Sequence, residues 1–125
     1  MPANPLDAYQ SVEKSTLSGR ELEASVLTKA ALRLHEVKTH WSGPDHEALL
    51  DEALKYNQRV WSFFQSEVSQ PDNPLPADIK QNILALSVFV DRRIFEVMAY
   101  PAPEKLDILI NINRNIAAGL RGDKG

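Results

Sequence analysis

The residues best suited to chemistry in this sequence are three histidines in its first half, His35, His40 and His46. Glu36 and His40 are four residues apart, a spacing that places two metal ligands on one face of a helix. His35 and His40 are five apart and diverge on a helix, and His46 follows a helix break. A structural metal site needs about four ligands with supporting hydrogen bonds. We therefore expect no metal, and interpret these histidines as surface residues near a helix end.

Motifs for catalysis or cofactor binding do not occur in the sequence. It has no Gly-rich phosphate loop, no Gly-x-Ser-x-Gly elbow, no dinucleotide fingerprint and no cysteine. The neighbouring acids Asp51 and Glu52 are best explained as a solvated face with Lys55, the i,i+4 partner of Asp51. We expect a protein that is not an enzyme and binds no cofactor.

Three asparagines, Asn57, Asn82 and Asn113, interrupt apolar stripes and are candidates for binding. A buried amide without a partner costs about 1–3 kcal/mol, so each must be paired or reach water. One interpretation is that they hydrogen-bond across helices and fix their register. The other is that one or more line a groove and bind the backbone of a partner. For each residue taken alone the first interpretation is favoured, and the sequence leaves both open.

Arg92 and Arg93 form a second candidate feature, because they stand in mid-helix between Phe89 and Phe95. Two adjacent arginines point in different directions. At least one is therefore expected to cross to the carboxylate of a neighbouring helix or to border an apolar patch, with a solvated surface as the alternative.

The elements that position these residues are four long helices separated by Pro- and Gly-rich loops. The first opens at residues 17–21 and ends at 42–44, the second runs from 44 or 45 to about 70, the third from 76 to about 100, and the fourth from 103 to Gly122. Residues 6–12 form a short helical segment that must dock or stay mobile. The sequence predicts an all-α bundle of four long helices plus this N-terminal segment.

Apolar residues at steps of three and four define the inward faces of these helices. They are Leu22, Val26, Ala30, Leu34, Val37 and Trp41 in the first helix, with Leu27 and Ala31 beside them, and Leu50, Leu54, Trp61, Phe64 and Val68 in the second, with Ala53 and Val60. In the fourth they are Leu106, Leu109, Ile110, Ile116, Ala117 and Leu120.

The third helix is apolar on two stripes. One holds Ile79, Ile83, Leu86, Val90, Ile94 and Val97, and the other holds Leu84, Val88, Phe89 and Phe95. Such a helix either lies at the centre of its bundle or has a second face for a partner. Its surplus apolar face is the strongest signal for protein binding in the sequence.

Length and composition indicate a single soluble domain of 125 residues with a net charge of −3. No signal sequence is recognisable, and the longest apolar run, residues 83–90, is far shorter than the ~20 residues of a membrane helix. We expect a cytoplasmic protein with no membrane contact. Residues 1–7 and 122–125 are expected to be mobile.

Several segments resemble the FlaF family of flagellar biosynthesis regulators from alphaproteobacteria. They are residues 21–24, 54–61, 72–76, 80–83 and 87–90, and most specifically the closing segment 109–122, LININRNIAAGLRG. They occur in order from about residue 8 to residue 122. The sequence departs from the family pattern at Gly19, where Pro is usual, and at Asn115, where Gly is expected.

The resemblance implies a factor for flagellin synthesis and export that works with the regulator FlbT. It suggests a chaperone-like role in which a groove covers the amphipathic terminal segments of flagellin. We place this groove around Trp61, Phe89 and the surplus face of the third helix, and predict as contact residues Asn57, Trp61, Asn82, Phe89, Arg92 and Asn113.

Two alternatives stay open. The protein acts only as an adaptor for FlbT, or it contacts flagellin mRNA directly. The acidic net charge and the lack of a basic stripe with interleaved aromatics disfavour direct RNA binding.

Overall fold

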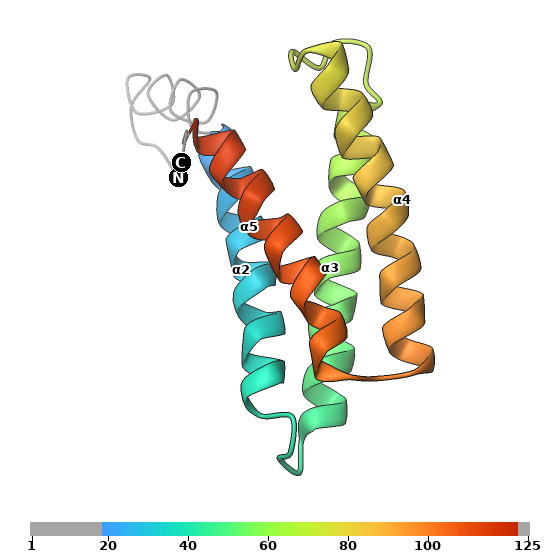
Figure 1. Ribbon diagram of the computed structural model, residues 1–125. Helices are drawn as coiled ribbons and strands as arrows, with labels where there is room; N and C mark the ends of the chain where they lie inside the picture. The colour runs from blue at the N-terminus through green and yellow to red at the C-terminus, as the bar shows by residue number, and fades with distance from the viewer. Residues whose placement is uncertain (1–18, 123–125) are drawn as a thin grey trace, which may run out of the picture.

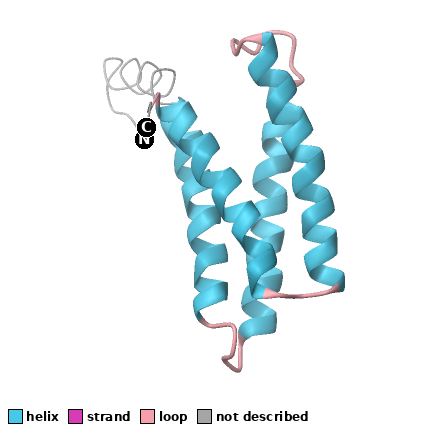
Figure 2. Cartoon of the chain, viewed as in Figure 1, coloured by secondary structure: helices cyan, strands magenta, loops and turns pink. Residues whose placement is uncertain are grey.

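A computed structural model describes residues 19–122 and contains only helices and loops in that range (Figures 1 and 2). The helices are α2 (Gly19–Thr39), α3 (His46–Val68), α4 (Ala77–Ala99), the 3-10 turn η1 (Pro103–Leu106) and α5 (Asp107–Arg121). The predicted all-α class and the four long helices are confirmed. The predicted segment 6–12 lies outside the described residues, as do the chain ends 1–7 and 123–125.

Proline and glycine residues mark the helix ends close to the predicted positions. The loop after α2 is closed by a hydrogen bond from the Gly43 N–H to the His40 carbonyl at 2.9 Å. Pro76 is the residue before the first turn of α4 and not its first helical residue. Gly122 has a φ of 80°, a left-handed conformation that favours glycine, and it ends α5 as predicted.

The helix α2 has α3 on one side and α5 on another (Figure 1). Polar contacts connect α2 with both ends of α5. Lys38 forms an ion pair with Asp107, and the Arg121 guanidinium donates a hydrogen bond to the Thr28 hydroxyl at 3.2 Å. These contacts fix α5 along one side of α2.

The core lies among α2, α3 and α5 and continues between α3 and α4. All seven residues predicted for the inward face of α3 are buried. On α2 the prediction is wrong for Leu22, whose side chain is 68% exposed, while Ala24 and Leu27 are fully buried. The physical reason is that α5 packs on the side of α2 that carries Ala24 and Ala31, whose small side chains allow a close approach of the two helices. Leu22 lies outside this contact and is exposed.

Helix α4 lies at the edge of the bundle. It packs mainly against α3, so one apolar stripe is covered, with Ile83, Val90, Ile94 and Val97 buried. The predicted alternative of a central third helix is therefore wrong. Ile79, at the open start of the helix, is exposed although the predicted stripe includes it.

Candidate partner-binding site

The six residues predicted to bind a partner divide into two groups in the structure. Three of them are buried between α3 and α5, namely Asn57, Trp61 and Asn113. The other three are exposed on α4, namely Asn82, Phe89 and Arg92. The structure does not bring the two groups together in one groove.

The buried group is a chain of hydrogen bonds between two helices. The Trp61 indole N–H donates to the Asn113 side-chain oxygen at 2.8 Å, and the Asn113 amide donates to the Asn57 side-chain oxygen at 2.6 Å. An indole nitrogen only donates, which fixes the orientation of the Asn113 amide and, through it, that of Asn57. For Asn57 and Asn113 this arrangement matches the interpretation that the asparagines hydrogen-bond across helices, whereas Asn82 is exposed and takes no part in it.

Asn57 is the last residue of this hydrogen-bond chain, and its side-chain amide is an unpaired donor among the described residues. Its side-chain nitrogen is buried and has no hydrogen-bond partner among the described residues. Trp61 is only 1% exposed, so the predicted groove around it does not exist on the described surface. The reason is the i,i+4 spacing of Asn57 and Trp61, which places both on the face of α3 that meets α5.

A further apolar stripe lies on α4 and contains none of the three exposed residues Asn82, Phe89 and Arg92. We call it the outer face of α4 and define it as Leu84, Val88, Asp91, Phe95 and Met98. These residues recur at steps of four, three, four and three, so they form one stripe along the helix. Val88 and Phe95 are 48% and 68% exposed, and Leu84 is half-buried. The apolar surface predicted for the third helix is therefore present.

Phe89 and Asn82 lie on the other flank of α4, where charged side chains cover part of the apolar surface. The Arg93 guanidinium lies 5.6 Å from the centre of the Phe89 ring and pairs with Glu96 at 3.3 Å. Arg93 thus borders an apolar residue, one of the two outcomes predicted for the arginines, while its carboxylate partner Glu96 lies on the same helix and not on a neighbouring one. Its neighbour Arg92 is exposed beside Val88 and Phe95.

A hollow of about 430 Å³ continues the outer face of α4 at its C-terminal end. It lies between the end of α4 and the start of α3. Met98 and Pro101 form one side, and His46, Leu50 and Leu54 line the other. The apolar stripe of α4 therefore leads into a concave surface.

A larger hollow was not predicted from the sequence. We call it the α2–α3 groove, and it has a volume of about 540 Å³. Its walls come from two helices, and the lining residues are Gly19, Leu22, Glu23, Val26, Tyr56, Arg59, Val60, Phe63 and Glu67. The exposed residues Leu22 and Phe63 are both among these lining residues.

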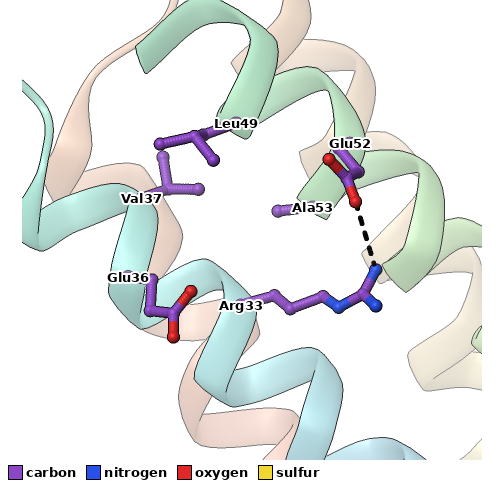
Figure 3. Close-up of a pocket in the computed structure, with 6 residues that line it drawn as sticks. All are labelled: Arg33, Glu36, Val37, Leu49, Glu52 and Ala53. Atoms are coloured by element: carbon purple, nitrogen blue, oxygen red, sulfur yellow. Dashed lines mark ion pairs between the residues drawn. The ribbon is translucent and has the colours of Figure 1, made fainter. Parts of the chain in front are cut away.

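The α2–α3 groove ends at a bridge of side chains. The Arg33 guanidinium lies 4.2 Å from the centre of the Tyr56 ring, and Arg33 also pairs with Glu52 at 3.7 Å. Figure 3 shows Arg33 reaching from α2 to Glu52 on α3. Both residues line a smaller hollow of about 150 Å³ together with Val37 and Leu49. The two hollows therefore follow one another along the same pair of helices.

The charged residues that line the groove are Glu23, Glu67 and Arg59, and Arg59 lies about two turns before Glu67 on α3. Burial raises the pKa of the Glu23 carboxyl above its ordinary value, and the negative charge of Glu67 raises it further, while Arg20 lowers it. Burial and the neighbouring Glu67 carboxylate thus outweigh the effect of Arg20 on the pKa of Glu23.

Comparison with protein families identifies the chain. The sequence model of the flagellar protein FlaF matches residues 5–120. The chain belongs to the FlaF family. The predicted resemblance is thereby confirmed, and this FlaF protein is a flagellar protein with an all-helical fold. Searches of curated proteins and of solved structures found no match.

Two further searches of the FlaF structure concern membranes and metals. Within residues 19–122, no helix is both long and apolar enough to cross a bilayer. The same range holds no group of three or more His, Cys, Asp or Glu side chains arranged to bind a metal ion. His40 uses one ring nitrogen in a hydrogen bond of 3.0 Å with the Glu36 carbonyl.

Proposed function

We propose that this FlaF protein is a cytoplasmic, chaperone-like factor that binds flagellin through the outer face of α4 and acts together with FlbT. The observation that carries the proposal is the exposed apolar stripe of α4. Its buried face already contributes to the core through Ile83, Val90 and Ile94, so Val88 and Phe95 have no structural task in the described chain. Exposed apolar surface of this kind marks interaction sites.

The spacing of the stripe suits a helical partner. Steps of four and three are the pattern by which two helices pack side by side along a seam. An amphipathic segment of flagellin would place its apolar residues against Val88 and Phe95 and continue toward Met98. Covering these side chains would keep flagellin soluble and prevent its polymerisation before export. The proposal assigns no catalytic step to any residue.

Polar residues would set the direction of the bound segment. Asp91 lies within the stripe, and Arg92 lies at its margin, so opposite charges are available on either side of Val88 and Phe95. Charged residues at the rim of an interface contribute more to orientation and association rate than to affinity. Asn57, Trp61 and Asn113 have no direct contact with the partner in this proposal, because they are buried.

The test is to mix the purified protein with monomeric flagellin and follow their co-elution in size-exclusion chromatography, with and without FlbT. We expect a complex that contains flagellin in both cases. Binding to FlbT alone would contradict the proposal and favour the adaptor role. Salt-sensitive binding of flagellin leader RNA in a filter assay, without a flagellin complex, would favour the RNA-contacting role.

A further inference from the structure

The α2–α3 groove lies on the side of α2 that α5 leaves uncovered. Thr28 and Lys38 contact α5, as described above, whereas Leu22 and Val26 line the groove. At 3.6 residues per turn, these two sets lie on opposite sides of α2. One side of the α2–α3 pair therefore has a helix packed on it, and within residues 19–122 the other side has none.

The shape of this surface suits an elongated partner. On α2 the groove and the smaller hollow beyond the Arg33 bridge extend from Leu22 to Val37, about 22 Å at 1.5 Å per residue. The opposite wall is formed by Tyr56, Val60 and Phe63, which recur at steps of four and three on α3. Both walls are thus helix faces that run along the groove, which is the geometry that receives a third helix.

The charges at the open end define the chemistry of the occupant. An apolar surface laid over the groove would remove Glu23 and Glu67 from water. Arg20 offsets the charge of Glu23 only in part, and Arg59, the basic residue of the lining, lies about two turns from Glu67 on α3. Burying carboxylates without a counter-charge is costly. A lysine or arginine of the partner, placed beside its apolar stripe at this end, would remove that cost.

We propose that the α2–α3 groove is a docking site for an amphipathic helix of a partner protein, in which a basic residue flanks the apolar stripe and pairs with Glu23 and Glu67. Leu22 and Phe63 are the apolar contacts, and Glu23 and Glu67 select the charge. This inference is independent of flagellin binding by α4, because it uses a different surface.

Two synthetic helical peptides of about 18 residues, each about 27 Å long as a helix, provide the probe. Both carry the same leucine stripe on an alanine-rich background, and only the charge of the residues beside the stripe differs, lysine in one and glutamate in the other. Fluorescence anisotropy with the full chain should give at least about tenfold tighter binding of the lysine peptide.

Matched variants assign the binding to the groove. Phe63→Ser should weaken binding of the lysine peptide by about tenfold or more, the effect of losing one buried aromatic contact. Leu32→Ser on α2 changes an apolar residue that lies outside the groove and is 52% exposed, against 50% for Phe63, and it should leave the affinity unchanged. Glu67→Gln should reduce the difference between the two peptides.

Absence of binding, equal affinity for the two peptides, or an affinity that Phe63→Ser does not change would overturn the proposal. Evidence that another molecule or segment occupies the groove would also overturn the proposal. A tenfold gain in peptide affinity on Tyr9→Ser would assign the groove to the N-terminal segment of the chain itself. A dimer in sedimentation that Phe63→Ser dissociates would assign it to a second copy.

Discussion

Two regions of the molecule contrast in the environment of their side chains. One is the buried hydrogen-bond chain of Asn57, Asn113 and Trp61, and the other is the outer face of α4. In the first, polar groups are enclosed and connect α3 to α5. In the second, apolar groups such as Phe95 face water. Buried polar groups are costly unless paired, whereas exposed apolar groups cost little until a partner covers them. We therefore expect the buried chain to govern stability and the outer face of α4 to govern binding.

The largest expected effect is on stability, from Asn113→Leu. This change leaves both the Trp61 indole N–H and the Asn57 side-chain oxygen without a partner in the core. Two newly unpaired buried groups should lower the free energy of unfolding by about 2–4 kcal/mol. Urea denaturation followed by tryptophan fluorescence would measure it, and a loss below about 1 kcal/mol would remove the distinction between the two regions.

Asn57→Leu is the matched control for that change, because Asn57 is the other asparagine of the buried hydrogen-bond chain. It removes the unpaired Asn57 amide nitrogen but leaves the Asn113 amide nitrogen unpaired in its place. The number of unpaired donors stays the same, so the free energy of unfolding should change by no more than about 1 kcal/mol. A loss as large as that of Asn113→Leu would show that Asn57 has a partner of its own.

Glu23→Gln should have the smallest effect and tests a group of intermediate burial. Because the folded-state pKa of Glu23 is raised, ionisation destabilises the fold as the pH rises above the unfolded value of 4.5. The variant should therefore be more stable than the wild type at neutral pH, by at most about 1 kcal/mol after solvent screening. Thermal denaturation should show this gain disappear at acidic pH, and a gain at pH 3 would contradict the assignment.

Much of the fold follows from sequence periodicity, and α3 shows why. Most of its apolar residues form one stripe, which predicts the buried face without knowledge of its neighbours, and Tyr56 and Phe63 lie outside that stripe. On α2 apolar residues cover a wider arc, and periodicity does not say which part of it is buried. The close approach of α5 selects Ala24 and Leu27 and leaves Leu22 exposed, which depends on tertiary packing.

The candidate surfaces differ in the same way. The additional apolar face of α4 can be predicted from the sequence, because a single helix carries two apolar stripes. The α2–α3 groove cannot be predicted from the sequence, because its two walls come from different helices. Only the structure shows that Leu22 on α2 and Phe63 on α3 line the same hollow. The pairing of Asn113 with Trp61 also could not be predicted, since the two residues are 52 positions apart.

The most direct test of the account compares the flagellin affinity of two single variants, Phe95→Ser on α4 and Phe63→Ser in the α2–α3 groove. Both side chains are at least half exposed, so neither change should alter the free energy of unfolding by more than about 0.5 kcal/mol. We predict that Phe95→Ser weakens flagellin binding by about tenfold or more and that Phe63→Ser weakens it less than twofold. Equal losses in both variants, or a loss in Phe63→Ser alone, would contradict the assignment of flagellin to the outer face of α4.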